Sequence, residues 1–185
     1  MSEIRKINTE ELKNIAGELK AGDKILLSGW VYTSRDAAHK RIKALIDSNE
    51  KLPYDLKNAV IYYAGPTPAP QGRPIGSCGP TTSGRMDKFA PEFLDLGLAA
   101  MIGKGERSQE VRDAIVRNKA LYLCAVGGAG ALAGKCIKSC EVIAFEDLGC
   151  ESVKKLCIED FPLIVADDIY GGDIFSEGRK KYCTL

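Results

Sequence analysis

The feature that most constrains this chain is a series of short apolar runs, most of which end in a polar or glycine-rich segment. Six runs are predicted as strands, over residues 24–33, 59–64, 98–102, 121–126, 141–145 and 163–166. In the second half these strands alternate with predicted helices over 89–96, 109–118 and 152–158, which favours parallel βαβ units. The first half looks more like antiparallel β structure. We therefore expect an α/β protein with a mixed sheet.

Smaller elements complete this prediction. Thr9 is expected to cap a short helix that ends near Gly22, Asp36 is expected to cap a second helix, and residues 75–78 could form another short strand. The 185 residues are 45% hydrophobic and 28% charged, which is ordinary for a globular protein. No repeat or low-complexity tract divides the chain, so residues 1–185 are expected to form a single domain.

Charge and hydropathy exclude several classes of function. The 26 Lys and Arg residues nearly balance the 25 Asp and Glu residues, so no bulk field draws the chain to nucleic acid or to a membrane surface. The longest uncharged stretch, residues 120–134, is shorter than the roughly 20 apolar residues that a membrane-spanning helix needs. The N-terminal residues lack the apolar segment of a signal peptide. A cytoplasmic location is expected.

The seven cysteines are an odd number and form no CxxC pair, and the chain has only one histidine. Disulfide scaffolds and zinc ribbons use closely spaced pairs, so we interpret the cysteines as buried thiols in a reducing compartment. No metal is assigned to this chain.

Candidate site residues lie where predicted strands end, because α/β proteins bind ligands there. Arg35, in the segment SRDAAH, could hold a carboxylate with the help of a helix N-terminus. The alternative is a surface arginine paired with Asp36. His39 could serve as a base, but a packed or exposed helix histidine is the favoured interpretation.

The segment 76–87 (GSCGPTTSGRMD) has no apolar residue from Gly79 to Arg85, so it cannot serve as core. Its hydroxyls, its free backbone N–H groups and Arg85 suit an anion. Lys104 lies between two glycines and could approach the same ligand, or could lie in a solvated loop. Together Arg35, Arg85 and Lys104 suit a small dicarboxylate, whose two ends need separate clamps. Because neither a strong base nor a set of metal ligands accompanies them, the chain looks like half of an active site.

A fourth segment, residues 127–134 (GGAGALAG), imitates a dinucleotide-binding fingerprint with one extra residue before its last glycine. This leaves open a function from another class, a nucleotide-binding module that uses residues 128–134. A non-catalytic assembly partner that keeps only the fold is a further alternative.

Several segments together resemble one family: SRDAAH, YYAGPTP, GSCGPTTSGRMD, MIGKGE, AVGGAGALA and LIVADDIYGGDIF. They closely resemble the β subunit, or C-terminal domain, of class I iron–sulfur hydro-lyases of the fumarase and tartrate dehydratase family, over about residues 22–175. The resemblance implies a swivelling β/β/α fold of three layers with mixed sheets. It also implies a separate α subunit that supplies the three cysteines of a 4Fe–4S cluster, whose open iron would act on the departing hydroxyl.

The resemblance also implies roles for individual residues. Arg35 and Arg85 would bind the substrate carboxylates, and Lys104 would add a further contact. Thr81 would be the catalytic base, and its hydroxyl would need activation, expected from an acid of the partner chain. Cys78 would not be a cluster ligand.

The implied protein is the β subunit of a two-chain fumarate hydratase, a hetero-oligomer that interconverts malate and fumarate plus water in the tricarboxylic acid cycle. The wording Ser83-Gly84-Arg85 favours the fumarase branch. The alternative within the family is the β subunit of a tartrate dehydratase, which converts tartrate to oxaloacetate.

Overall fold

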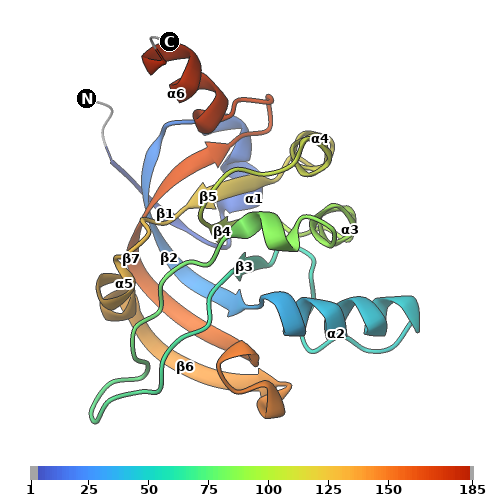
Figure 1. Ribbon diagram of the computed structural model, residues 1–185, viewed down its shortest axis with the longest axis vertical. Helices are drawn as coiled ribbons and strands as arrows, with labels where there is room; N and C mark the ends of the chain where they lie inside the picture. The colour runs from blue at the N-terminus through green and yellow to red at the C-terminus, as the bar shows by residue number, and fades with distance from the viewer. Residues whose placement is uncertain (1–3, 184–185) are drawn as a thin grey trace.

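Seven strands of mixed direction form one sheet at the centre of the fold (Figure 1). The computed structural model of the chain describes residues 4–183. The strands are β1 (Arg5–Asn8), β2 (Lys24–Thr33), β3 (Val60–Tyr62), β4 (Ala100–Gly103), β5 (Leu121–Cys124), β6 (Ile137–Ala144) and β7 (Val153–Asp167). The α-helices are α1 (Leu12–Ile15), α2 (Asp36–Asp47), α3 (Ala90–Asp95), α4 (Gln109–Asn118), α5 (Gly130–Cys136) and α6 (Ile174–Tyr182). The 3₁₀ helices are η1 (Ala16–Glu18), η2 (Ser83–Met86) and η3 (Glu146–Glu151).

The pairing of the strands closes part of the sheet on itself. β1 to β5 pair in sequence order and run parallel, whereas β7 runs antiparallel to β2, β5 and β6. Because β7 pairs with both β2 and β5, the strands β2, β3, β4, β5 and β7 form a closed ring of hydrogen-bonded neighbours. The predicted mixed α/β class is confirmed.

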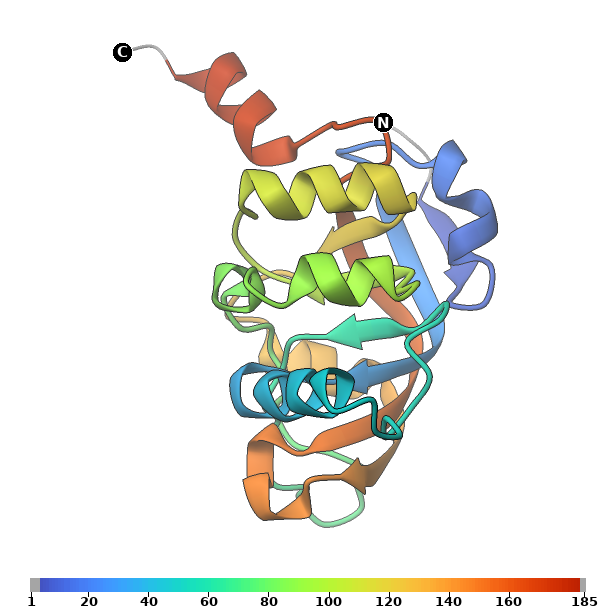
Figure 2. The ribbon, with the colours of Figure 1, turned by 90° about the vertical axis from the view of Figure 1, so that its right-hand side faces the viewer.

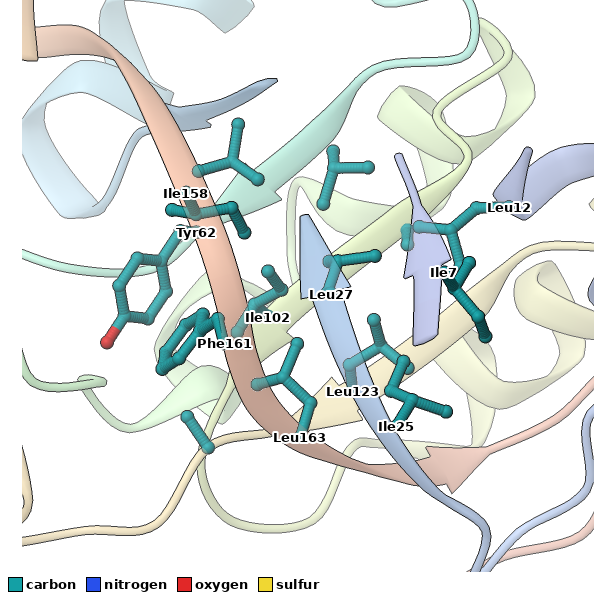
Figure 3. Close-up of a cluster of buried hydrophobic side chains, with 14 of the residues drawn as sticks. Ile7, Leu12, Ile25, Leu27, Tyr62, Ile102, Leu123, Ile158, Phe161 and Leu163 are labelled. Atoms are coloured by element: carbon teal, nitrogen blue, oxygen red, sulfur yellow. The ribbon is translucent and has the colours of Figure 1, made fainter. Parts of the chain in front are cut away.

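Neighbouring residues of the central strands belong to two separate hydrophobic clusters. Val60 and Tyr62 of β3 point into the first cluster, and Ile61 between them points into the second. Side chains alternate between the faces of a strand, so this sheet is buried on both faces and its strands read as continuous apolar runs. All five strands of the ring contribute to the first cluster, which therefore lies inside the ring (Figure 3).

Three helices cover the outer face of the parallel strands. α2, α3 and α4 lie side by side against the sheet (Figure 2) and bury their apolar residues in the second cluster. α4 shows why such a helix starts and stops where it does. The Ser108 hydroxyl caps its first turn by accepting from Val111 N, and Lys119 ends it in the left-handed conformation. Across residues 4–183, no helix has the length and apolar character needed to cross a membrane.

The antiparallel arrangement predicted for the first half is wrong. β1, β2 and β3 run parallel, with Arg5 opposite Ile25 and Tyr32 opposite Ile61. The reason is that helical segments bridge consecutive strands, α1 and η1 before β2 and α2 before β3, so each following strand returns in the same direction. The antiparallel neighbour of β2 is β7, which comes from the opposite end of the chain.

The helix predicted over residues 152–158 is also wrong, because this segment begins the 15-residue strand β7. Two neighbours, β2 on one side and β6 on the other, satisfy its backbone groups. Leu156 and Ile158 then point into the first cluster with the period of two expected of a strand. Tertiary pairing outweighs the local pattern here.

Three smaller predictions fail for local reasons. Asp36 does not cap the second helix: it is the first residue of α2, and its carboxylate accepts from arginine side chains instead. Thr9 does not cap the first helix: its hydroxyl accepts from Trp30 N at 3.1 Å and so ties the end of β1 to β2. Residues 75–78 form no strand. They belong to a loop in which Gly76 N and Ser77 N donate to the Thr67 carbonyl and hydroxyl, at 3.2 and 2.8 Å.

Candidate functional site

The four predicted site residues come from loops at one edge of the sheet. Arg35 follows β2 directly, and Lys104 follows β4. Thr81 lies beyond the end of β3, where its backbone N–H donates to Tyr63 O at 2.8 Å, and Arg85 lies in the next turn, η2. Because β2, β3 and β4 are parallel neighbours, their carboxyl ends meet at the same edge.

A single carboxylate joins the two predicted arginines. Asp36 Oδ2 accepts from Arg35 Nε at 3.2 Å and from Arg85 Nη2 at 2.9 Å. The pairing of Arg35 with Asp36, considered from the sequence as the alternative to a ligand site, is therefore present. It does not remove Arg35 from the site, because the same carboxylate brings Arg85 to it.

Glu151 is a second acid at this cluster, and it is not among the residues predicted from the sequence. Glu151 Oε1 lies 3.0 Å from Arg35 Nη2, and Oε2 accepts from the backbone N–H of Ala37 at 2.8 Å. Glu151 comes from η3, 114 positions from Ala37, so no local pattern could have linked them. Gly65 completes the surroundings of Arg35, since a Cβ there would lie 2.7 Å from Arg35 Nη1.

Thr81 is connected to the same cluster through Arg85. Arg85 Nη2 donates to Thr81 Oγ1 at 2.6 Å. A guanidinium donor at this distance favours negative charge on the hydroxyl oxygen, which is what a hydroxyl needs to act as a base. The Arg85 side chain is 46% exposed and that of Arg35 is 23% exposed, so a small anion can reach both.

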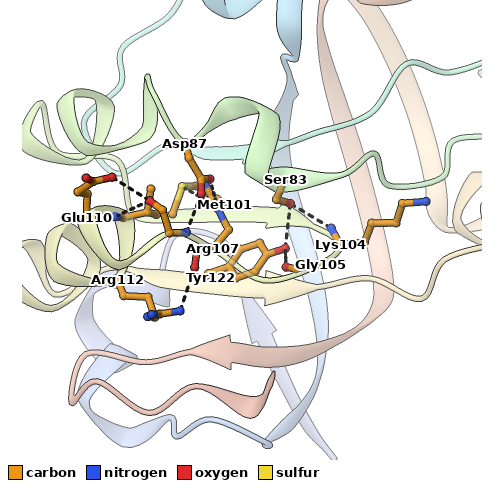
Figure 4. Close-up of polar contacts among 11 residues, drawn as sticks. Ser83, Asp87, Met101, Lys104, Gly105, Arg107, Glu110, Arg112 and Tyr122 are labelled. Atoms are coloured by element: carbon orange, nitrogen blue, oxygen red, sulfur yellow. Dashed lines mark hydrogen bonds and ion pairs between the residues drawn. The ribbon is translucent and has the colours of Figure 1, made fainter. Parts of the chain in front are cut away.

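Lys104 is linked to the loop of Arg85 through its backbone. Its N–H donates to Ser83 Oγ at 3.1 Å and its carbonyl accepts from Ser83 N at 2.9 Å. Its side chain points away from these contacts (Figure 4), and its Cδ approaches Gly127. With the residues that the structure describes, the Lys104 ammonium makes no hydrogen bond or ion pair.

The glycines of the segment 127–134 have a packing role. Gly130 O accepts from Cys78 N at 3.0 Å, and a Cβ at Gly134 would lie 2.5 Å from Gly76 O. These glycines let the short helix α5 approach the loop that leads into Thr81. Close approach of two backbones explains their presence without a nucleotide.

His39 is a packed helix histidine, as favoured from the sequence. Its ring is fully buried, stacks on Phe93 at 5.0 Å between ring centroids, and has Nδ1 2.7 Å from Ser34 Oγ. Burial, with the positive charge of Arg107, lowers the pKa of His39 to about 3. The ring is therefore a weak proton acceptor that a ligand cannot reach, and His39 is not a base at the site.

The cysteines do not all fit the prediction of buried thiols. Cys78 is buried, and burial raises the pKa of its thiol to about 12. Cys150 and Cys183 are exposed, and the remaining four are partly buried. Within residues 4–183, no three His, Cys, Asp or Glu side chains are grouped so that they could hold a metal ion.

The chain matches a model of a known family and several known proteins. The family model, described as Fumarase C-terminus, matches residues 2–178. The anaerobic class I fumarate hydratase of Escherichia coli is 40% identical over 94% of this chain, but this chain spans only 32% of that enzyme. A putative L(+)-tartrate dehydratase subunit beta of Methanocaldococcus jannaschii is 40% identical over 89% of this chain, and 87% of that subunit is covered. The L(+)-tartrate dehydratase subunit beta of Escherichia coli is 33% identical, also with 87% covered.

Proposed function

The chain belongs to the Fumarase C-terminus family, and we propose that it is the β subunit of a two-chain iron–sulfur hydro-lyase. Its coverage supports the subunit assignment: it spans about a third of the fumarate hydratases but nearly the whole of the tartrate dehydratase β subunits. The observation that carries the proposal is the cluster of Arg35, Arg85 and Thr81 at one edge of the sheet, with Lys104 in the neighbouring loop.

Arg35 and Arg85 are proposed to bind the carboxylates of a small dicarboxylate, and Lys104 to add a further contact. A planar guanidinium matches a carboxylate with two parallel hydrogen bonds, so each arginine can hold one end of the substrate. Asp36 keeps the two guanidinium groups at a fixed spacing before substrate arrives. This spacing orients the carbon between the carboxylates relative to Thr81.

Thr81 is proposed to remove the proton from the carbon beside a carboxylate and to hold it on Oγ1. The hydrogen bond that Arg85 donates to Oγ1 stabilises the negative charge that this oxygen must carry. His39 does not serve as this base, because its ring is fully buried against Phe93 and its lowered pKa makes it a weak proton acceptor. Oγ1 must first lose its own hydroxyl proton, and the carboxylate of an acidic residue of the partner chain is expected to accept it.

The described residues do not fit a cluster site, because no group of three potential ligands comes together. We propose that the 4Fe–4S cluster is bound by an α subunit and that the two chains act together as a hetero-oligomer. The tartrate dehydratase relatives are themselves called subunits, which supports a partner of this kind.

The proposed reaction is the interconversion of malate and fumarate plus water, as in the tricarboxylic acid cycle. Similarity to class I fumarate hydratases over 94% of the chain favours it. A second candidate is the dehydration of tartrate to oxaloacetate, which the whole-chain match to tartrate dehydratase β subunits favours. Kinetics with malate, fumarate and tartrate on the assembled enzyme distinguish the two, since only the true substrate gives a high kcat/KM.

Reconstitution with the α chain under anaerobic conditions tests the site. Thr81→Ala should abolish most turnover, while Thr67→Ala, in the neighbouring loop, serves as a matched control. Full activity of the Thr81→Ala complex would refute the role of Thr81.

A non-catalytic assembly partner would keep full turnover when Arg35, Thr81 and Arg85 are all replaced. Calorimetry with dinucleotides tests the nucleotide-binding alternative, since a hydro-lyase subunit should bind none.

We propose in addition that residues 1–185 form one domain of the swivelling β/β/α type with three layers, in a cytoplasmic enzyme. Support comes from the two hydrophobic clusters, one inside the ring of strands and one beneath α2, α3 and α4. Limited proteolysis should leave the chain intact from β1 to β7, whereas an early cut between two stable fragments would contradict a single domain.

A further inference from the structure

Backbone contacts join two loops of the candidate site. One loop carries Thr81 and Arg85, and the other carries Lys104. Thr82 and Lys104 form an isolated parallel bridge, and Ser83 both donates to Lys104 O and accepts from Lys104 N. Ser83 itself is fully buried. Gly103 makes its position possible, because a Cβ there would collide with Ser83 Oγ.

Tyr122 of β5 is the next member of this chain of contacts (Figure 4). Its hydroxyl lies 2.8 Å from Ser83 Oγ and 2.7 Å from Gly105 O. Burial raises the pKa of Tyr122, so the hydroxyl keeps its proton. A carbonyl oxygen can only accept, so the Tyr122 proton goes to Gly105 O. The Ser83 proton then goes to the Tyr122 oxygen, and Ser83 Oγ accepts from Lys104 N–H.

Each hydroxyl in this series of hydrogen bonds therefore has one defined acceptor. The Ser83 hydroxyl holds the peptide N–H of Lys104, and the Tyr122 hydroxyl holds the carbonyl of Gly105, the next residue along the chain. Gly105 has a positive φ of 83°, which lets the chain turn sharply just after Lys104. The contacts fix the direction in which the Lys104 side chain leaves the backbone.

The Tyr122 ring is held in place as well. The Arg107 guanidinium lies over the rings of Tyr122 and Tyr63, at 4.9 and 5.4 Å from their centroids. Arg107 is anchored in turn by Asp87 at 2.7 Å. Tyr54 makes a useful contrast, because its buried hydroxyl has no hydrogen-bond partner within residues 4–183. Packing a tyrosine in this core does not by itself require a bonded hydroxyl, so the bonds of Tyr122 are specific to its position.

We propose that Tyr122 is a positioning residue for Lys104, acting through Ser83 and Gly105. The inference rests on the proposed function, in which Lys104 contacts the dicarboxylate. Tyr122 is buried within β5 and does not itself reach the substrate. Its hydroxyl sets where the Lys104 ammonium stands, and hence how well the substrate is held relative to Thr81.

A double-mutant cycle on kcat/KM of the enzyme assembled with its α subunit tests this role. Tyr122→Phe removes only the hydroxyl and should lower kcat/KM about tenfold, as for a displaced hydrogen-bonded contact. In an enzyme that already carries Lys104→Gln, Tyr122→Phe should change kcat/KM less than about twofold, because residues that act through each other are not additive. Tyr54→Phe is the matched control and should leave kcat/KM unchanged in both backgrounds.

Unchanged kcat/KM in Tyr122→Phe would overturn the inference. So would an equal loss with and without Lys104→Gln, since that is the result of general loosening of the fold. These outcomes leave the proposed function intact, provided that Lys104→Gln alone lowers kcat/KM. A fully active Lys104→Gln enzyme would overturn both the inference and the role of Lys104 in the proposed function. If Tyr122→Phe does not assemble, Ser83→Ala provides the same cycle.

Discussion

Two groups of arginine and aspartate side chains differ in their exposure to solvent. One contains Arg35, Asp36 and Arg85, and the other contains Asp87 and Arg107. Arg35, Asp36 and Arg85 are partly exposed, at 23%, 36% and 46% of their side-chain surface. Below them the Arg107 side chain is fully buried, with its Nε bonded to Asp87. Exposed ion pairs add little to folding and can exchange partners, whereas a buried charge must keep its partner. The exposed group can therefore receive a ligand while the buried group holds the loops that present it.

The largest effect is expected where the buried group is broken. Asp87→Asn leaves the Arg107 charge buried without its partner, and Arg107 Nη2 already lacks a hydrogen bond to the described part of the chain. The free energy of unfolding should fall by about 3–5 kcal/mol, measured by chemical denaturation. Asp95→Asn, which removes the partner of the exposed Arg117, should cost less than about 1 kcal/mol. Equal losses in the two variants would erase the distinction between buried and exposed pairs.

Replacing the buried acid Asp167 should stabilise the folded chain at high pH, whereas replacing Asp87 should destabilise it. Asp167, at the end of β7, is buried, and neither carboxylate oxygen has a hydrogen-bond partner among the residues that the structure describes. Burial, with the nearby charge of Asp173, raises its pKa to about 7. Between about pH 4 and pH 7 the folded chain keeps a proton that the unfolded chain has lost, so its contribution to stability falls as the pH rises.

Asp167→Asn removes this dependence. The unfolding free energy of the variant minus that of the wild type should be about 2 kcal/mol larger at pH 8 than at pH 5. Denaturant titrations at the two pH values measure the difference. A gain of the same size at both pH values would mean that Asp167 does not titrate in this range.

Within the exposed group, Asp36→Asn should affect activity more than folding. It removes the charge that holds both arginines, so kcat/KM of the assembled enzyme should fall about tenfold, while the free energy of unfolding should change by less than about 1 kcal/mol. Asp95→Asn again serves as control and should retain full activity. A folding loss as large as that of Asp87→Asn would show that Asp36 supports the fold rather than the site.

Much of the site could be predicted from the sequence because its residues follow strand ends. Arg35, Thr81, Arg85 and Lys104 lie in polar or glycine-rich segments that cannot serve as core, and parallel strands bring these segments to one edge. Glu151 could not be predicted, because its contact with Arg35 depends on how η3 returns to the start of α2.

The fold was predicted less completely for a related reason. Apolar runs located most of the strands, but they carry no information about which strands pair. The two-sided pairing of β7 with β2 and β6 turned a predicted helix over 152–158 into a strand. It also gave β2 its antiparallel neighbour from the far end of the chain. The pairing of β2 with β7 joins segments more than a hundred residues apart, where local propensity has no influence.

The central claim is that the exposed cluster serves the substrate rather than the fold, and Arg85→Ala tests it most directly. The measurement is kcat/KM of the anaerobically assembled enzyme, beside the free energy of unfolding of the same variant. We expect kcat/KM to fall by the equivalent of about 2–5 kcal/mol, because a charged clamp is lost, and the unfolding free energy to change by less than about 1 kcal/mol. Full activity of Arg85→Ala, or a loss of activity explained by unfolding, would contradict the account.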